Sequence, residues 1–436
     1  MDETIKAIYN SWLNRKLPEI LPRETKIDGY LNMEPRKIIV VTGFRRIGKT
    51  YLVLSGLESL LKEATREEII YLNFDDERIP RRTEFLSALI PSLRSNMKSE
   101  IQFLILDEIQ DMPEWSNWLR RINDTEDIRI VITGSSSKVS SREIPTELRG
   151  RCLEIKLFPL SFREFLKFKK IEITPEKIPN SDNEKVQLRR AMDEYIMFGG
   201  MPEVVLAQED KKSEILQEYF RTVVQRDITE RHRVKNEEGL KALLRLLLNS
   251  TQYSISKLHN TLKSMNYSIG KTTLQQYLSY IEQSYFMQSL EIFYPKVKDR
   301  LQYPRKVYFI DTGFINALSV RLSKNLGRLY ENIVATELMR RAGNHQWGIH
   351  YWKDSQGKEV DFVVVRDLAA SQLIQVCYDL EDLDTKKREI RSLLKAEREL
   401  NCSNLLIITK DQEGIEKIKE SMITFIPLWK WLLNND

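Results

Sequence analysis

Short apolar runs alternate with helical patterns in the first third of the chain. Residues 37–42 (KIIVVT) lead into a glycine-containing loop, which is followed by a helical pattern over residues 50–62. Further apolar runs occupy residues 69–74 (IIYLNF), 103–106 (FLIL) and 128–133 (IRIVIT). Strands that alternate with helices in this way predict a mainly parallel sheet with helices on both faces.

The next segment predicts mostly helices. Ser161 and Glu164 have the spacing of a capping box at a helix start. Residues 171–187 are polar and contain two prolines, so they predict a loop or linker. The Gly-Gly-Met-Pro sequence that begins at Gly199 predicts a helix end, and a long helical pattern resumes over residues 211–233.

Residues 241–310 have a different pattern. Helical stretches at residues 241–249, 254–262 and 271–284 precede two apolar, β-like runs that are separated by a basic stretch. Three helices followed by a β-hairpin predict a winged helix-turn-helix. From residue 327 onward, helical and β-like runs alternate again.

The composition is that of a globular protein with more than one domain. The chain has 436 residues, of which 42% are hydrophobic and 30% are charged, so it can bury a core. No apolar run approaches the roughly 18–20 residues that cross a bilayer, and we therefore expect a cytoplasmic protein without a membrane partner. The three cysteines lie far apart and predict neither a metal site nor a disulfide framework.

The small net charge of +5 is unevenly distributed. Residues 211–306 contain 17 Lys and Arg against 9 Asp and Glu, and residues 241–281 contain five basic residues and no acid. A basic segment without acids is the electrostatic pattern expected for nucleic-acid binding. A solvated surface, or an interface to an acidic neighbour, is the alternative.

Within a winged helix, residues 271–284 would be the recognition helix, whose start enters the DNA major groove. Lys and Gln side chains there can contact bases or phosphates, and a basic wing that includes Lys306 would meet the DNA backbone. The residues expected to contact DNA are Lys257, Lys263, Lys271, Thr272 and Gln275. Because winged helices also dock proteins, a protein partner is the alternative.

The glycine-containing loop carries a nucleotide-binding motif. Residues 43–50, GFRRIGKT, match G-x-x-x-x-G-K-[ST] at every defined position, between a predicted strand and a predicted helix. The glycines let backbone N–H groups turn toward a phosphate, Lys49 adds a positive charge near the β- and γ-phosphates, and the Thr50 hydroxyl can ligate Mg²⁺. The residues expected to hold ATP are Gly43, Arg45, Arg46, Ile47, Gly48, Lys49, Thr50 and Tyr51.

Two acids follow the apolar run at residues 103–106 and complete this motif. Asp107, at the carboxyl end of the predicted strand, can hold the hydrated Mg²⁺ together with Thr50. Glu108 can orient the attacking water and act as its base. The sequence therefore predicts hydrolysis of ATP with Mg²⁺ as the metal.

Two further residues are candidates for contact with the γ-phosphate. Ser135, after the run at residues 128–133, could sense the γ-phosphate through its hydroxyl, and Thr133 and Ser136 are the alternatives. Arg151 could act as an arginine finger toward a neighbouring subunit, with Arg149 as the second choice. A simple glycine–serine loop and a surface salt bridge are the alternatives without such a function.

The chain resembles the AAA+ superfamily in the order of five segments: GFRRIGKT, LILDEIQ, ITGSSS, LRGRCLEIKLFPLSFREF and FGGMPEVV. More narrowly, it resembles archaeal-type AAA ATPases with an arginine-rich P-loop, which often carry a C-terminal domain related to the PD-(D/E)XK nucleases. The resemblance covers nearly the whole chain. It implies that Lys49 and Thr50 bind ATP and Mg²⁺, that Asp107 ligates the metal and that Glu108 activates water.

The expected fold class is α/β, with a P-loop NTPase (AAA+) parallel sheet, a helical lid, a winged helix-turn-helix and a C-terminal α/β nuclease-like domain. The expected domains are the AAA+ P-loop ATPase core at residues 1–155, the lid and linker at 156–235, the winged helix at 236–312 and an inactive nuclease-like domain at 313–436.

The nuclease resemblance is incomplete at the residues that would cleave DNA. A PD-(D/E)XK site needs a helix glutamate, an aspartate and a Glu-x-Lys sequence on the next strand, because the carboxylates hold a metal and the lysine positions water. Glu331 and Asp361 stand at the first two positions, but Gln375 and Cys377 replace the glutamate and the lysine. Glu331 and Asp361 are left for weak metal binding or a structural role.

The sequence thus predicts a Mg²⁺-dependent, ATP-hydrolysing AAA+ protein that couples its nucleotide state to DNA binding or remodelling. Its expected partners are ATP, ADP and DNA. The alternative is a slow ATP-dependent switch or scaffold that recruits a protein partner, and an ATP-regulated nuclease ranks third. The sequence leaves the oligomeric state open, with a homo-oligomer among the possible states.

Overall fold

The structure is a computed structural model that describes residues 2–134, 148–173, 181–294, 303–319, 325–345 and 347–434. The chain divides into two compact units, Met1–Leu157 and Phe158–Asp436. The predicted ATPase core at residues 1–155 lies within the first unit, and its bounds stay a prediction. The finer division of the second unit into lid, winged helix and nuclease-like domain stays a prediction.

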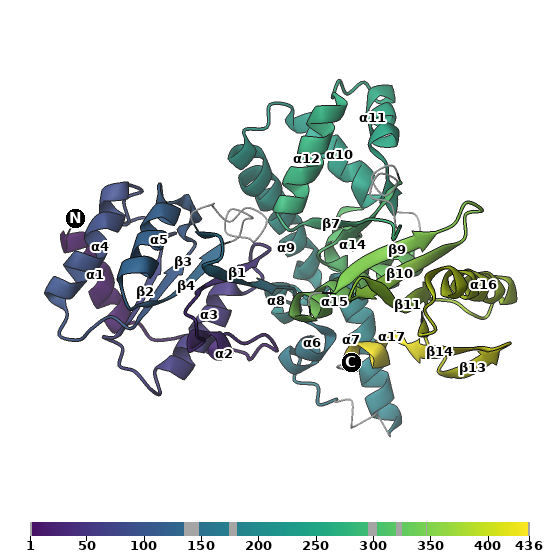
Figure 1. Ribbon diagram of the computed structural model, residues 1–436, viewed down its shortest axis with the longest axis horizontal. Coiled ribbons are helices and arrows are strands. Elements are labelled where there is room, and N and C mark those ends of the chain that lie inside the picture. The colour runs from purple at the N-terminus through teal and green to yellow at the C-terminus, as the bar shows by residue number, and fades with distance from the viewer. Residues whose placement is uncertain are drawn as a thin grey trace. The chain divides into compact units, whose positions relative to one another are not determined.

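The first unit contains a five-stranded parallel sheet in the order β2-β3-β4-β1-β5 (Figure 1). Strands β1 to β4 are almost wholly buried. A parallel strand covered on both faces carries apolar residues on both sides, which is why the sequence shows these four as continuous apolar runs. The strands are β1 (Ile38–Gly43), β2 (Ile69–Asn73), β3 (Phe103–Asp107), β4 (Arg129–Gly134) and β5 (Cys152–Leu157).

Strand β5 was not predicted from the sequence. It lies at the edge of the sheet and pairs only with β1 among the described strands. Glu154 and Lys156 interrupt its apolar residues, and both are half-buried. The Thr42 hydroxyl donates a hydrogen bond to Glu154 Oε1 at 2.6 Å, so this edge position tolerates polar side chains.

Helices flank this sheet. Trp12 is buried, and its indole N–H donates to the carbonyl oxygen of Ile69 at 2.6 Å, which ties the first helix to β2. The helices are α1 (Asp2–Leu13), α2 (Asp28–Leu31), α3 (Lys49–Leu60), α4 (Thr83–Asn96), the short 3₁₀ helix η1 (Ile109–Asp111) and α5 (Trp115–Thr125). The predicted α/β fold with a parallel sheet is confirmed for this unit.

The second unit begins with helices, as predicted. Ser161 caps the first of them, and its hydroxyl and the Glu164 carboxylate form the predicted capping box. The helices are α6 (Phe162–Phe168), α7 (Asp182–Phe198), α8 (Pro202–Leu206), α9 (Glu209–Thr222) and a π-helical continuation, η4 (Val223–Glu230).

The loop predicted at residues 171–187 is shorter than expected. Helix α7 already begins at Asp182, because Ser181 and Glu184 form a second capping box that the sequence interpretation overlooked. Residues 174–180 lie outside the described residues. Helix α7 ends at Phe198, and Gly199 follows with a positive φ of 74°, as the Gly-Gly-Met-Pro sequence predicted.

Three helices and a small antiparallel sheet come next. The sheet has the order β6-β8-β7, and its buried residues pack with the apolar faces of the helices. The expected buried face of the last helix is present, because Leu274, Leu278 and Ile281 are all buried. The elements are α10 (Glu237–Leu248), β6 (Gln252–Tyr253), α11 (Ile255–Ser264), α12 (Lys271–Gln283), β7 (Met287–Leu290) and β8 (Arg305–Phe309).

The rest of the second unit is built on a six-stranded mixed sheet in the order β13-β14-β12-β11-β10-β9. Strands β11, β12 and β14 pair in parallel, and the remaining pairs are antiparallel. The elements are α14 (Thr312–Leu318), α15 (Leu326–His345), β9 (Gly348–Lys353), β10 (Glu359–Arg366), β11 (Ala369–Cys377), α16 (Leu383–Leu400), β12 (Leu405–Thr409), β13 (Gly414–Ile418), β14 (Ser421–Pro427) and α17 (Leu428–Leu433).

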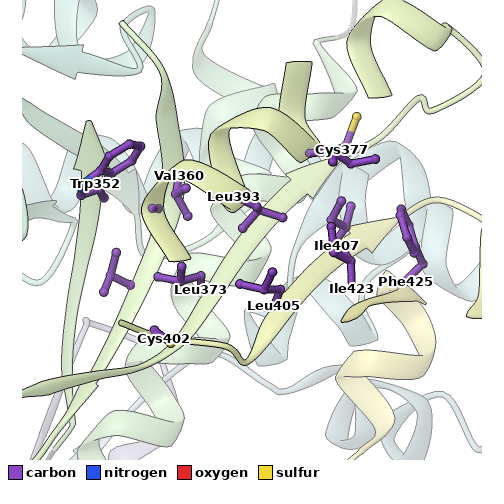
Figure 2. Close-up of a cluster of buried hydrophobic side chains, with 13 residues drawn as sticks. Trp352, Val360, Leu373, Cys377, Leu393, Cys402, Leu405, Ile407, Ile423 and Phe425 are labelled. Atoms are coloured by element: carbon purple, nitrogen blue, oxygen red, sulfur yellow. The ribbon is translucent and has the colours of Figure 1, made fainter. Parts of the chain in front are cut away.

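An apolar core joins this sheet to α16. Figure 2 shows the cluster, in which Leu393 of the helix lies over Leu373, Leu405 and other strand residues. Cys377 and Cys402 belong to the same cluster, so they act as small apolar residues. Burial raises the pKa of the Cys377 thiol to about 12, which keeps it uncharged.

No helix in the described part of the chain has both the length and the apolar character needed to cross a membrane.

Candidate nucleotide-binding site

The loop between β1 and α3 depends on backbone conformations that favour glycine. Gly48, at the start of α3, has a φ of 97°, and Gly43 has a φ of 148°. A Cβ atom on Gly43 would lie 2.5 Å from the carbonyl oxygen of Leu157, so only glycine allows the close approach of β5. No side chain caps the N-terminus of α3, and its backbone N–H groups and dipole are therefore suited to an anion.

Lys49 is directed into this loop. Its side chain is buried, and Nζ lies 3.4 Å from the carbonyl oxygen of Gly43 and 3.3 Å from that of Phe44. Glu108 Oε1 lies 3.6 Å from the same ammonium. The lysine therefore places a positive charge between the loop and the carboxyl end of β3.

Asp107 is the centre of a buried hydrogen-bond network. The Thr50 hydroxyl donates to Asp107 Oδ2 at 2.7 Å, and the Tyr71 hydroxyl donates to the same oxygen at 2.9 Å. The Thr133 hydroxyl donates to Asp107 Oδ1. Burial raises the pKa of Asp107, while the hydrogen bonds from the two threonines oppose this rise. A hydroxyl and a carboxylate thus converge, which is a donor set that suits Mg²⁺.

Glu108 lies next to this network in a strained conformation. Its φ is 55°, in the left-handed region that side chains other than glycine rarely adopt. Its backbone N–H donates to the Thr133 hydroxyl at 3.0 Å, and Gln110 Nε2 donates to its Oε2 at 2.6 Å. The backbone turn and these contacts direct the carboxylate toward Lys49.

The structure adds Tyr71 and Arg23, which the sequence interpretation did not place in the site. Tyr71 bonds Asp107, and Arg23 donates from Nη1 to the carbonyl oxygen of Ile47 at 3.0 Å. Burial and the nearby Glu108 raise the pKa of Asp75, while Arg45 opposes the rise. The position of Asp75 after β2, at the edge where the carboxyl ends of parallel strands meet, predicts a place near the nucleotide, with a solvated loop as the alternative.

The other predicted nucleotide-binding residues take up different environments. Ile47 is fully buried and anchors the loop, whereas Arg46 and Tyr51 are exposed and Arg45 is half-buried. Arg46 also has a positive φ of 60°.

Of the residues predicted to contact the γ-phosphate, the structure describes Thr133, Arg149 and Arg151. Ser135 and Ser136 lie outside the described residues, whereas Thr133, the alternative, contacts both acids. Arg151 lies at the amino end of β5, opposite to the loop, and forms a two-point ion pair with Asp124 at 2.9 and 3.0 Å. An arginine-finger role for Arg151 stays a prediction that requires a second copy of the chain.

In the second unit, the residues predicted to contact DNA all lie on the surface. They belong to α11 and to the start of α12, whose apolar faces are buried. The exposed residues are Lys257, Lys263, Lys271, Thr272 and Gln275. Lys271 Nζ lies 3.4 Å from the Ser256 hydroxyl, which connects the two helices at this surface.

Lys306 corrects the prediction of a basic wing. It is only 4% exposed, and its Nζ contacts three carboxylates instead of solvent. Burial alone lowers the pKa of Lys306, but Asp361 and Glu331 outweigh it and hold that pKa well above its usual value. This ammonium is therefore charged, and it is not available to DNA.

The residues compared with a nuclease site are close together, but they form a different network. Gln375 Oε1 accepts from the backbone N–H of Asp361 at 3.3 Å, and its Nε2 donates to Glu389 Oε2 at 2.6 Å. The Cys377 side chain belongs to the apolar core. Neither residue supplies the charge that a glutamate or a lysine would supply there.

Three family models match successive parts of the chain. A model described as an AAA domain matches residues 35–166. Models described as domains of unknown function match residues 189–325 and 326–431. The first match covers the loop and all five strands of the parallel sheet. The first unit therefore has the AAA-type P-loop fold that the motifs predicted.

Relatives extend over most of the chain. The uncharacterized protein MJ1544 of Methanocaldococcus jannaschii is 38% identical over 432 residues, which are 96% of this chain and 92% of the relative. An uncharacterized protein of Haemophilus influenzae is 29% identical over 369 residues, 83% of this chain and 88% of the relative. Among solved structures, the Walker-type ATPase paby2304 of Pyrococcus abyssi matches with a TM-score of 0.46 and 12% identity, over 71% of this chain and 99% of that chain.

Proposed function

Because the chain belongs to the family of the uncharacterized Methanocaldococcus jannaschii protein MJ1544 and carries an AAA domain, we propose that it is a Mg²⁺-dependent ATPase that couples its nucleotide state to DNA binding or remodelling. The observation that carries the ATPase part is the meeting of Lys49, Thr50, Asp107 and Glu108 at the carboxyl edge of one parallel sheet. Two separate sequence motifs, residues 43–50 and residues 103–108, thus meet at one place in the fold.

The loop and the start of α3 bind the phosphates. Backbone N–H groups at the uncapped helix start attract the anion, and Lys49 adds its charge from inside the loop. Gly43 and Gly48 permit the loop conformation. Arg45, Arg46, Ile47 and Tyr51 complete the proposed nucleotide-binding set.

Thr50 and Asp107 would hold the Mg²⁺ ion, because their oxygens are 2.7 Å apart and hard cations prefer such ligands. In the described residues, no group of three or more His, Cys, Asp and Glu side chains forms a metal site. This absence agrees with an ion that one or two protein oxygens share with phosphate. When bound, Mg²⁺ neutralises charge that develops on the phosphates.

Glu108 is the proposed base. Its carboxylate lies 3.6 Å from the Lys49 ammonium, which is directed into the loop. From there it can orient water for attack in line with the leaving phosphate and accept the proton. Thr133 is a positioning residue, because its hydroxyl bonds both Asp107 and the backbone of Glu108.

The DNA part of the proposal rests on the second unit. Helices α10 to α12 and the antiparallel pair β7–β8 follow the order of a winged helix-turn-helix. The start of α12 is exposed and carries Lys271, Thr272 and Gln275. Such side chains contact DNA phosphates and base edges.

Nucleotide binding and turnover of two variants test the ATPase. Lys49→Ala should lose most ATP affinity, measured by calorimetry, whereas Lys62→Ala, a change of an exposed lysine just after α3, should not. Glu108→Gln should bind ATP but release phosphate at least 10²-fold more slowly, on the order of the effect of a general base. Unchanged ATP affinity in Lys49→Ala, or an unchanged rate in Glu108→Gln, would contradict the proposed site.

A further inference from the structure

A single lysine lies at the centre of three carboxylates in the second unit. Lys306 Nζ lies 2.9 Å from Glu331 Oε1, 2.8 Å from Glu359 Oε1 and 2.8 Å from Asp361 Oδ1. Lys306 belongs to β8, Glu331 to α15 and the other two acids to β10. Lys306 donates hydrogen bonds to Glu331 and Asp361, and it forms an ion pair with Glu359.

The acids of this cluster outnumber its bases. Lys353 supplies a second ammonium, 2.9 Å from Glu359 Oε2, and the Tyr308 hydroxyl donates to Glu331 Oε1 at 2.6 Å. Three acids therefore share two ammonium groups. Asp361 is buried, and Glu331 and Glu359 are half-buried. Carboxylates that have lost part of their water are stabilised by a nearby cation, so this geometry favours a cation at the place where the three oxygens meet.

The carboxylates are oriented by contacts that do not involve Lys306. The backbone N–H of Val376 donates to Asp361 Oδ2 at 2.9 Å, and Lys353 holds the second oxygen of Glu359. In metal sites, hydrogen bonds to the ligand atoms or groups that do not face the metal orient the ligands in the same way. The three oxygens should therefore stay directed at the same point when the lysine side chain is removed.

We propose that the ammonium of Lys306 occupies a divalent-cation site formed by Glu331, Glu359 and Asp361, and that it excludes the metal from this site. The ammonium of Lys306 takes the place of the metal ion. It neutralises the carboxylates and connects β8 to α15 and β10 through ion pairs. Lys306 thus adds a second obstacle to DNA cleavage, besides the loss of charge at Gln375 and Cys377.

Binding of Mn²⁺ to the full chain without nucleotide tests the proposal, because free Mn²⁺ is counted directly by electron paramagnetic resonance. Lys306→Ala should bind about one more Mn²⁺ per chain than the parent, since three carboxylate oxygens become available to a hard cation. Adding Asp361→Asn to Lys306→Ala should abolish this gain. Any Mn²⁺ bound near Asp107 is common to all three chains and cancels in the comparison. A folded Lys306→Ala chain with no gain would overturn the proposal.

Two further measurements are the thermal unfolding of Lys306→Ala with and without Mn²⁺ and the binding of Mn²⁺ to the parent chain. If Lys306→Ala unfolds in chelator, Mn²⁺ should restore its thermal transition, and failure of Mn²⁺ to do so would overturn the proposal. The parent's transition should not respond to Mn²⁺. If the parent binds Mn²⁺ and Glu331→Gln removes this binding, the lysine does not exclude the metal, and the proposal is equally wrong. None of these readouts depends on ATP hydrolysis.

Discussion

At the scale of single residues, Asp107 shows how the nucleotide site is organised. Its carboxylate accepts hydrogen bonds from Thr50 of α3, Tyr71 of β2 and Thr133 of β4, so three elements fix one side chain. A buried carboxylate needs such donors because it has lost its water. The residue proposed to hold the metal is thereby placed before any ligand binds.

Thr133→Val should slow ATP turnover about 10-fold, equivalent to ~1.4 kcal/mol, while the ATP affinity changes little. Valine keeps the shape but removes the hydroxyl that bonds Asp107 and the backbone of Glu108. Steady-state phosphate release and nucleotide titration measure the two effects. Thr125→Val, a change at the end of α5, is the matched control. Turnover equal to that of the parent would remove the positioning role.

Asp311 gives a second prediction at this scale. Burial raises its pKa to about 6, although N–H groups of Gly200 and Gly313 donate to it and oppose the rise. Because the folded chain holds this proton more tightly than the unfolded chain, Asp311 should lower the free energy of unfolding as the pH rises from about 4 to 6, by at most roughly 3 kcal/mol.

Asp311→Asn should remove this pH dependence. Asparagine cannot ionise, but it loses one of the two acceptor oxygens, so the variant should be less stable than the parent at pH 4 and closer to it at pH 7. Denaturant unfolding at both pH values measures the difference, with Asp367→Asn at an exposed turn as control. A stability difference independent of pH would contradict the assignment.

At the scale of elements, α12 has one buried, apolar face and one exposed, polar face. Leu274, Leu278 and Ile281 are buried and fix the helix, so its opposite face is free to carry polar side chains. The neighbouring β8 is different, because Lys306 holds it to the carboxylates of α15 and β10. The surface offered to DNA is therefore formed by the helices more than by the strands.

Lys271→Ala should weaken binding to duplex DNA at low salt and reduce the slope of log affinity against log salt by about one phosphate contact. Fluorescence anisotropy at several salt concentrations measures both. Lys387→Ala, which changes an exposed lysine of α16, should leave affinity and slope unchanged. If the slope of Lys271→Ala equals that of the parent, the DNA surface lies elsewhere.

At the scale of the whole molecule, the proposed chemistry and the proposed DNA contact belong to different units. The site around Asp107 lies in residues 1–157, and α12 lies in residues 158–436. Coupling therefore requires that ATP and ADP favour different states of the whole chain. The arginine-finger prediction for Arg151 also belongs to this scale, since a homo-oligomer would have to supply the second copy.

DNA affinity should differ between the ATP and ADP states, by about 5- to 150-fold if the coupling is of ordinary size. The Glu108→Gln variant can be compared with each nucleotide, because it should retain ATP. By linkage, DNA should change the ATP affinity by the same factor. Equal DNA affinity in both states, with a protein partner retained only with ATP, would favour the switch or scaffold instead.

Several features followed from the sequence alone because they are local. The loop at residues 43–50 and the acids at residues 107 and 108 are fixed by the chemistry of phosphate and Mg²⁺ at short spacing. The buried strands β1 to β4 were visible because burial on both faces demands continuous apolar runs. The edge strand β5 was missed because Glu154 and Lys156 interrupt its apolar residues. The capping box at Ser181 was missed because it lies in a polar stretch with two prolines, which predicts a loop.

Only the tertiary structure decided which distant side chains meet. Lys306 looks like any other basic residue of a wing, yet it pairs with Asp361, which is 55 positions away in the sequence. Tyr71 joined the site for the same reason, because neighbouring strands of a parallel sheet come from separate parts of the chain. Thr133 was named from the sequence only as a possible contact for the γ-phosphate, and its hydrogen bond to Asp107 also depends on this packing. Sequence spacing determines the chemistry within one loop or helix, whereas partners across a sheet or between sheets depend on packing that no local pattern encodes.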